Sequence, residues 1–492
     1  MLPKNLKYGS KLESANCKSF RTNIQPQNGT GNYGLGDTIS FSIPTRRNLV
    51  MVPSESYLKF SIAVKNDIGG ATNYYRWDSC GAHGVISQIR VSHGSNQLEN
   101  INTYGQLAKL LFDLQVNTPS SAGKFNILAG TRGDSMVVPR TSVPNSSTTN
   151  INGVTLATAN TPTSAELTSI LNSVLTNSAY ATNSGEFYGA VNSAATSTAQ
   201  TYCLNLISMC GSLLQDRYFP LFACDSAPLS LQVTLVDAIT KAFSCASIAS
   251  NSSSIIVSNV EFVANMIELS DEAMMTIVNS LQGEPLQFVI PSWSNYQSTF
   301  PAAQTQINVP IPAKYSSVKS LFSCFRDKFN TVLFMPYSSV TAGLSSYQYR
   351  IGSTLAPLKA PAGTKDNNAE YFAEVLKAIG SMSDNYHSPA IDKFSYSLEA
   401  SVTEASIANN SLYPHTIQQG VTTSGSFCVA LDLESFSNAD KSSIFSGYNS
   451  NTDDIFLTLN YGTATPSQLR IDSYALFDQV LVCANGTAFV RF

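Results

Sequence analysis

The sequence carries one pattern of strands and helices twice, at a constant separation. Ile43-Pro44 closes one candidate strand, and Ile311-Pro312 closes another 268 positions later. The apolar stripe of a candidate helix repeats at the same offset of 268, with Tyr104, Leu107 and Leu111 matched by Phe372, Val375 and Ile379. A constant offset across a strand and a helix indicates one fold present in two copies.

A second offset appears near the end of each copy. Four apolar positions are separated by 226 residues: Phe219 and Phe445, Leu229 and Ile455, Leu231 and Leu457, Leu235 and Tyr461. The two offsets differ by 42, so the first copy carries about 42 more residues between its helix and its closing strand. Arg90 and Arg350, separated by 260, form a further candidate pair in the repeat.

The length of the chain agrees with more than one folded unit. A chain of 492 residues is expected to fold into two or three domains. Charged residues make up only 13% of the chain, about half the usual share, while 43% is hydrophobic. Such a chain buries large cores and exposes a neutral polar surface, which suits extensive contact between proteins. The net charge of −4 provides no global attraction to nucleic acid.

Most candidate elements are short strands of alternating polarity. Leu229–Leu235 alternates strictly, and 56–64 and 455–461 show the same period of two. Each copy has about eight such strands and one or two short helices, among them Thr103–Leu114 and Asn367–Ile379. Because helices do not alternate with strands, a doubly wound α/β fold is excluded. The pattern predicts an all-β chain of two tandem eight-stranded jelly-roll β-sandwiches, with a few short helices in loops.

The predicted domain organisation has three parts. Residues 1–36 are expected to form an N-terminal arm, 37–250 the first jelly roll and 251–492 the second. The strand Ile255–Met266 is expected to open the second copy, followed by a helix that Ser270 caps and Gly283 ends. A long loop insertion of the first jelly roll is placed at about 115–200, with its own helix at Ser164–Leu175.

Four stretches of the chain carry a family resemblance: IPTRRNLVMVPSESYLKF, IRVSHGSNQLENINTYGQLAKLLFDL, YQYRIGSTLAPLKAPAGTKDNNAEYFAEVLKAIG and FCVALDLESFSNADKSSIFSGYNSNTDDIFLTLNY. They resemble the double jelly-roll major capsid proteins of tailless icosahedral DNA viruses, nearest to the Polinton-like, adintovirus and virophage branch. The last stretch contains a turn typical of the family, Ser446-Gly447-Tyr448-Asn449, before an alternating strand. The resemblance covers about 40–492 and concerns patterns of fold rather than catalytic signatures.

The resemblance implies a structural role. Members of that family form pseudo-hexagonal homotrimeric capsomers that tile an icosahedral shell, with both jelly rolls perpendicular to it. By this analogy, the chain would be a virion component made inside the host cell, and residues 115–200 would form an outward tower. Its partners would be itself, neighbouring capsomers, and penton and minor capsid proteins. A virion spike or receptor-binding β-sandwich is the alternative function, and a carbohydrate-active β-sandwich enzyme is a second rival.

The N-terminal arm is basic. It carries Lys4, Lys7, Lys11, Lys18 and Arg21 against the single acidic residue Glu13. One interpretation is a tail that touches an internal membrane or the packaged genome, facing inward or lacing neighbouring capsomers. The other is a solvated terminus that becomes ordered only on assembly.

Signals for secretion and for membrane insertion are not expected. The start of the chain is interrupted by charge every few residues, unlike a signal peptide, and no stretch approaches the roughly 20 apolar residues of a membrane span. The nine cysteines are scattered and include no CxxC pair, which favours reduced, buried thiols over a disulfide framework.

Catalytic and metal-binding motifs are scarce, and we expect no enzyme activity, catalytic residue, cofactor or metal. Cys80, His83 and His93 form the best metal candidate, but structural zinc sites use four ligands in close pairs, so loop packing is the preferred interpretation. No GxSxG motif occurs, and Gly123-Lys124 lacks the rest of a phosphate-binding loop.

Paired acids and tryptophans have structural explanations as well. Asp432 with Glu434, and Asp453 with Asp454, lack the fixed separation that glycoside hydrolysis requires, so turn positions are expected. Trp77 and Trp293 are expected to fill cores or interfaces rather than to stack on sugars.

Overall fold

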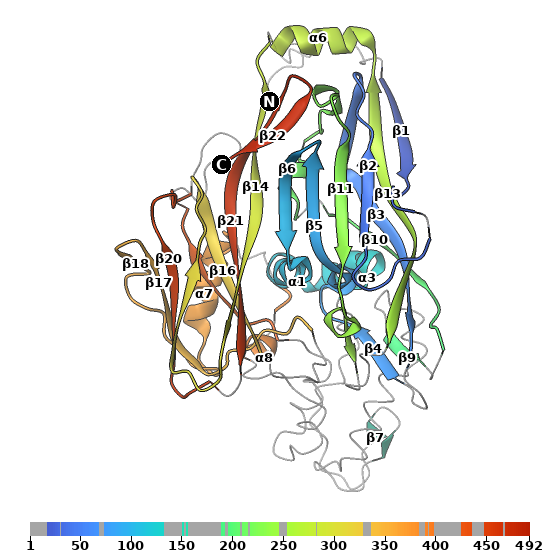
Figure 1. The fold of residues 1–492 in the computed structure, drawn as a ribbon. Coiled ribbons are helices and arrows are strands. Elements are labelled where there is room, and N and C mark those ends of the chain that lie inside the picture. The colour runs from blue at the N-terminus through green and yellow to red at the C-terminus, as the bar shows by residue number, and fades with distance from the viewer. Residues whose placement is uncertain are drawn as a thin grey trace, which may run out of the picture.

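The computed structural model of the chain consists mostly of antiparallel strands arranged in two sandwiches (Figure 1). The structure describes residues 17–29, 31–67, 73–131, 150–151, 154–155, 188–191, 195–206, 209–214, 217–245, 253–281, 283–327, 336–382, 389–391, 393–397, 425–434, 447–465 and 468–492. The predicted helix Ser164–Leu175 lies outside these residues, as does a strand that the sequence pattern also predicts at 331–335.

The first sandwich is formed by two four-stranded sheets. One has the order β1 (Cys17–Ile24), β13 (Ser254–Leu269), β3 (Leu49–Lys65) and β10 (Gln200–Leu204). The other has the order β2 (Thr38–Ile43), β11 (Leu229–Leu235), β5 (Ile86–His93) and β6 (Asn96–Asn102). Along β11 every second residue is buried, because successive side chains point to opposite faces of a strand.

The second sandwich repeats this construction. Its sheets have the order β14 (Leu286–Phe300), β21 (Leu469–Ala484), β16 (Val318–Asp327), β19 (Cys428–Asp432), and β15 (Gln306–Ile311), β20 (Ile455–Tyr461), β17 (Leu344–Ile351), β18 (Thr354–Ala356). A final strand, β22 (Thr487–Arg491), pairs with β21 as a hairpin. Apart from β22, the described residues of each sandwich therefore form eight strands in the same topological order, as the sequence pattern predicts for a jelly roll.

Strand register confirms both main offsets of the repeat. Leu229 of β11 pairs with Ile43 of β2, and Ile455 of β20 pairs with Ile311 of β15. The two pairs are related by the predicted separations of 226 and 268. The proposed pairing of Phe219 with Phe445 lies outside the described residues at its second position.

The predicted pairing of Arg90 with Arg350 in the repeat is wrong by two residues. Val91 lies opposite Leu231, and Tyr349 lies opposite Leu457, so β5 and β17 are related by an offset of 258 rather than 260. Arg90 therefore corresponds to Gln348, not to Arg350. The error arises because a shift of two keeps a side chain on the same face, so alternation alone does not detect it.

Strand pairing also moves the limits predicted for the first copy. Residues 17–24 are not part of an arm, because they pair along their whole length with β13. The strand expected to open the second copy, β13, instead pairs with β3 and β1 of the first sandwich. Helix α6 (Asp271–Leu281), at one end of the molecule, then connects β13 to β14 of the second sandwich (Figure 1). Ser270 accepts a hydrogen bond from the Ala273 amide, as expected of its cap.

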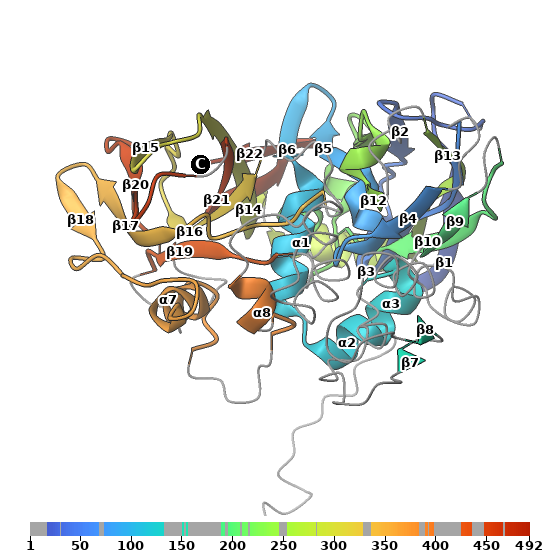
Figure 2. The same ribbon diagram turned by 90° about the horizontal axis from the view of Figure 1, so that it is seen from below.

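Equivalent helices follow equivalent hairpins. Helix α1 (Tyr104–Gln115) follows β6, and α7 (Ala369–Ala378) follows β18 and packs on β19. The first copy also contains α2 (Thr118–Ala122), α3 (Lys124–Ala129), the hairpin β7 (Asn150–Ile151) and β8 (Val154–Thr155), and a small sheet of β12 (Phe243–Cys245), β4 (Asn73–Trp77) and β9 (Tyr188–Val191). The hairpin β7–β8 lies at the end opposite α6 (Figure 1). Helix α8 (Lys393–Tyr396) lies beside α1 (Figure 2).

Two strands are longer than predicted. The sequence pattern also predicts strands at 286–291, 471–477 and 479–482. In the structure β14 continues to Phe300, and β21 joins the last two predicted strands into one. They pair over 15 residues without a register shift, since a partner along the whole length compensates for weak local alternation. Within the described residues, no helix has the length and apolar character to cross a membrane.

Candidate functional site: the polar contacts between the two sandwiches

Helix α1 lies between the two sandwiches, which stand side by side (Figure 2). An amphipathic helix normally turns its polar stripe toward water. In α1 every residue from Tyr104 to Leu114 is buried, including Gln106, Lys109 and Asp113. All three of these polar side chains form hydrogen bonds with the second sandwich, Gln106 with Ser339, and Lys109 and Asp113 with Ser426. The helix is therefore part of a joint between the sandwiches.

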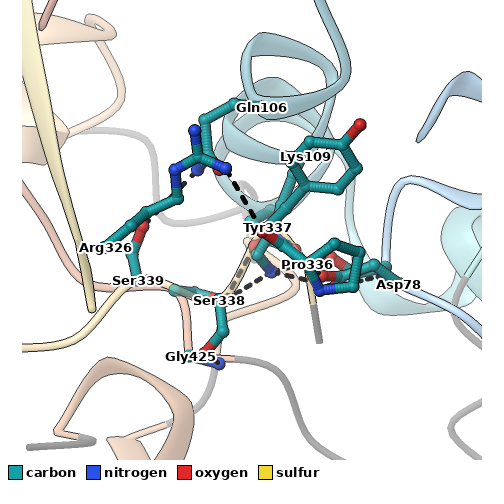
Figure 3. Close-up of polar contacts among 12 residues, drawn as sticks. Asp78, Gln106, Lys109, Arg326, Pro336, Tyr337, Ser338, Ser339 and Gly425 are labelled. Atoms are coloured by element: carbon teal, nitrogen blue, oxygen red, sulfur yellow. Dashed lines mark hydrogen bonds and ion pairs between the residues drawn. The ribbon is translucent and has the colours of Figure 1, made fainter. Parts of the chain in front are cut away.

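The centre of this joint is the ammonium group of Lys109, which is only 1% exposed. Its nitrogen donates hydrogen bonds to Asp113 at 2.8 Å, Ser79 at 2.9 Å and Ser426 at 3.3 Å, and lies 3.6 Å from the Asp78 carboxylate. Three donors are thus matched by three acceptors, which a buried ammonium requires. We call the group Asp78, Ser79, Lys109, Asp113, Tyr337 and Ser426 the lysine junction; Figure 3 labels Asp78, Lys109 and Tyr337 of this group.

The second sandwich contributes Tyr337 and Ser426 to the lysine junction. The Tyr337 amide donates to Asp78 at 3.1 Å, and its hydroxyl donates to the Gly84 carbonyl at 2.7 Å. Ser426 donates to Asp113 at 2.7 Å. A Cβ atom on Gly105 would lie 2.4 Å from the Tyr337 hydroxyl oxygen, so a glycine at this position of α1 makes room for the ring.

Two supports hold these residues within the second sandwich. The segments of Ser339 and Ser426 form a parallel bridge, and the Gly425 amide donates to Ser338 at 2.9 Å. Arg326 donates to the Pro336 carbonyl at 3.2 Å (Figure 3). It also forms an ion pair of 2.8 Å with Asp472, which is fully buried. The arginine thereby anchors the segment that carries Tyr337.

Glu99 of β6 forms a second polar contact between the sandwiches, which we call the glutamate joint. Its carboxyl accepts hydrogen bonds from the Ser212 amide at 3.1 Å and hydroxyl at 2.7 Å, both in the first sandwich. It also accepts from the Ser292 hydroxyl of β14 at 2.9 Å. Burial raises the pKa of Glu99 to about 7, although the hydrogen bonds act in the opposite direction.

We predict that Glu99→Gln changes how stability depends on pH. The pKa rises from 4.5 in the unfolded chain to about 7 in the folded one, so the stabilisation from the protonated carboxyl is present below pH 4.5 and lost as pH rises through about 7. The wild type should lose about 3 kcal/mol of stability relative to the variant over this range. Urea unfolding at a series of pH values measures the difference; a constant gap between the two proteins would contradict the prediction.

The hairpin β21–β22 forms the third contact, the hairpin joint. His93 of β5 accepts a hydrogen bond at Nδ1 from the Ala488 amide at 3.1 Å and therefore donates from Nε2 to the Cys224 carbonyl at 3.0 Å. Asn96 donates to the Ala488 carbonyl at 3.1 Å. The imidazole thus connects both sandwiches through main-chain groups.

The candidate metal ligands have other bonding partners. His83 lies 2.9 Å from the Tyr104 hydroxyl, and burial lowers its pKa to about 3, which keeps the ring neutral. His93 belongs to the hairpin joint, and Cys80 is a buried thiol whose pKa is raised by burial. Among the residues that the structure describes, no three His, Cys, Asp or Glu side chains are grouped to hold a metal ion.

The paired acids lie at strand ends rather than at the expected turn positions: Asp432 ends β19, and Asp453 and Asp454 directly precede β20. Asp432 accepts a hydrogen bond from the Glu434 amide at 3.0 Å, and Glu434 pairs with Lys319 at 3.1 Å. Asp454 pairs with Lys314 on the surface at 2.7 Å, and Asp453 accepts from the Tyr448 hydroxyl.

Both tryptophans fill cores, as predicted. Trp77 stacks on Phe243 with ring centroids 4.0 Å apart and donates to the Tyr202 hydroxyl at 2.9 Å. Trp293 packs against Phe322 with centroids 5.9 Å apart. Buried rings of this kind are not available to stack on a sugar.

Sequence reasoning missed all three joints. The available signal for the lysine junction is the spacing of Lys109 and Asp113, four residues apart on the polar stripe of an otherwise apolar helix. That spacing is equally common on solvated helices. The joints hold the two sandwiches in one relative orientation, because their directional hydrogen bonds and ion pairs form only in that orientation.

Comparisons with known proteins identify the fold. No family model matches the sequence, and no curated protein matches it. Among solved structures, the capsid of PBCV-1 virus aligns over 98% of this chain and 98% of its own, with 11% identity and a TM-score of 0.54. The Faustovirus major capsid protein aligns over 98% and 94%, with 10% identity and a TM-score of 0.52.

The Sputnik virophage structure is similar to the same extent. It aligns over 100% of this chain and 92% of its own, with 8% identity and a TM-score of 0.53. These alignments show that the chain shares the double jelly-roll fold of major capsid proteins over nearly its whole length. At identities this low, the similarity concerns the fold alone.

Proposed function

We propose that this chain, which has the double jelly-roll fold of major capsid proteins, is itself a major capsid protein that assembles into pseudo-hexagonal homotrimeric capsomers. The observation that carries the proposal is the presence of two sandwiches of identical strand order, side by side in one chain. Three such chains arranged in a ring present six similar units around one axis, which is the geometry that tiles an icosahedral shell.

The joints between the sandwiches support this role. A capsomer subunit must keep its two jelly rolls in one orientation, because an error in that angle is repeated in every copy. The lysine junction, the glutamate joint and the hairpin joint connect the sandwiches through buried, directional contacts. Buried polar contacts of this kind favour one arrangement over others, whereas purely apolar packing permits sliding.

We infer domain limits that follow the strand order. The first jelly roll begins with β1 and ends with β13 at Leu269, and the second begins with β14 at Leu286. Helix α6 is then the connection between the domains, and the N-terminal arm shortens to residues 1–16.

The proposed partners are penton proteins, minor capsid proteins and neighbouring capsomers. An internal membrane or the genome is a further partner for the arm through Lys4, Lys7 and Lys11. Lys18 and Arg21 belong to β1, where Arg21 lies over the Tyr57 ring.

The first test of the function is the size of the purified protein. We expect a species of about three times the chain mass of 52.9 kDa in size-exclusion chromatography with light scattering, because trimer interfaces of this type are large and obligate. Negative-stain microscopy should show roughly hexagonal particles. A monomer that stays stable at micromolar concentration would contradict the proposal.

Two rival functions predict other results. A virion spike or receptor-binding protein would bind specific sugars on a glycan array, whereas we expect a capsomer subunit to give no dominant signal. A carbohydrate-active enzyme would lose hydrolysis on replacement of Asp432 or Glu434. The structure gives these side chains other partners, because Asp432 accepts a hydrogen bond from the Glu434 amide and Glu434 pairs with Lys319.

A further inference from the structure

The hairpin joint brings two cysteines from opposite sandwiches together. Cys224 directly follows a short 3-10 helix of the first sandwich (Leu221–Ala223), and Cys483 lies in β21 of the second. Both are free thiols, and they are 0% and 2% exposed. They lie 259 positions apart in the sequence, so only the packing of the sandwiches makes them neighbours.

Main-chain contacts on both sides fix this proximity. The Cys224 carbonyl and the Ala488 amide bond to opposite nitrogens of one imidazole, at 3.0 and 3.1 Å. Ala488 is the direct cross-strand partner of Cys483 in the β21–β22 hairpin. Two residues beyond Cys224, the Ser226 amide donates to the Gly486 carbonyl in the turn of that hairpin at 3.0 Å.

The two thiols also influence each other's ionisation. Their interaction raises the pKa of Cys224 and lowers the pKa of Cys483. A lower pKa favours the thiolate, which is the nucleophile in thiol–disulfide exchange.

We propose that Cys224 and Cys483 are an oxidation site, at which a small-molecule disulfide converts the two thiols into a bridge that ties the first sandwich to the terminal hairpin of the second. Cys483 attacks one sulfur of the reagent and releases one thiol; Cys224 then attacks the Cys483 sulfur of the mixed disulfide and releases the other. Two protein thiols are oxidised, and one reagent disulfide is reduced to two thiols. This inference goes beyond the proposed function and holds whether or not the chain forms a shell.

A second pair of neighbouring cysteines, within one sandwich, serves as an internal control. Cys324 and Cys428 are buried, directly opposite one another on β16 and β19, and lie within one sandwich. A bridge between them would leave the two sandwiches unconnected. Cys17 is exposed and should accept a mixed disulfide readily without a partner.

The experiment treats the full-length protein with oxidised glutathione, blocks the remaining thiols with iodoacetamide in denaturant, and identifies linked peptides by mass spectrometry without reduction. We expect one linked pair containing Cys224 and Cys483 that disappears on reduction. The variants Cys224→Ser and Cys483→Ser should lower its signal to background, whereas Cys324→Ser should leave it unchanged. Cys224→Ser should retain glutathione on Cys483. Oxidation should raise the thermal midpoint of the wild type and of Cys324→Ser, but not of Cys224→Ser or Cys483→Ser.

Because both thiols are buried, a missing linked peptide is informative only if the reagent can reach them. The treatment is therefore repeated at urea concentrations below the unfolding transition, where alkylation of the reduced protein demonstrates that Cys483 has become accessible. Alkylation of both Cys224 and Cys483 under these conditions, without a linked peptide, would overturn the inference. A protein that forms the bridge but runs as a monomer would overturn only the capsid function.

Discussion

Replacing Lys109 by methionine is expected to destabilise the protein by about 3 to 5 kcal/mol, because removing one partner of a buried ion pair leaves uncompensated charge. Methionine occupies a similar volume, so the loss comes from Asp78 and Asp113 rather than from a cavity. Both carboxylates keep hydrogen bonds, from Tyr337 and Ser426, but each loses its ion pair with the Lys109 ammonium. Urea unfolding of variant and wild type at equal protein concentration measures the difference.

A matched pair of variants separates burial from charge. Lys241 forms an i,i+4 pair with Asp237, as Lys109 does with Asp113, but its side chain is 58% exposed. Lys241→Met should change stability by at most about 0.5 kcal/mol, since solvent screens the pair. Adding Asp78→Asn and Asp113→Asn to Lys109→Met should restore most of the lost stability, because the two buried carboxylates that lost the ammonium are then replaced by neutral amides. Equal effects of Lys109→Met and Lys241→Met would show that the junction does not bear on stability.

Replacing Gly211 by alanine should separate the two sandwiches at the glutamate joint. The added Cβ would lie 1.7 Å from the Pro291 carbonyl oxygen of β14, far inside van der Waals contact. That oxygen belongs to the main chain of a strand paired along its length with β21, so no side-chain rotation relieves the clash. Displacement would also break the bonds that Glu99 accepts from Ser212, and we expect a loss of more than about 3 kcal/mol.

The control for this variant is Gly462→Ala. Its Cβ would meet only the Ser345 Cβ at 3.8 Å, which is ordinary contact, so we expect little change in stability. Pro291→Ala should not rescue Gly211→Ala, because the clash involves the carbonyl and not the ring. Thermal unfolding and particle size together provide the readout; a Gly211→Ala protein with the wild-type midpoint would contradict the close approach of the two sandwiches.

Much of the architecture follows from local patterns that a sequence displays. Strands β11 and β20 have the predicted limits, because strict alternation marks a half-buried strand from end to end. Helices α1 and α6 begin within one residue of the predicted positions, where Thr103 and Ser270 precede them. The assignment of β13 to the second copy failed because its alternation predicts a strand without identifying the partner.

The sequence by itself determined that two similar sandwiches occur in tandem, since periodicity and repeat spacing are properties of neighbouring residues. Only the tertiary structure decided which sandwich receives β13 and what the polar stripe of α1 contacts. Lys109 and Ser426 are 317 positions apart, and Glu99 and Ser292 are 193 apart. No local pattern encodes such partners, because their proximity arises only after both sheets have formed and packed together.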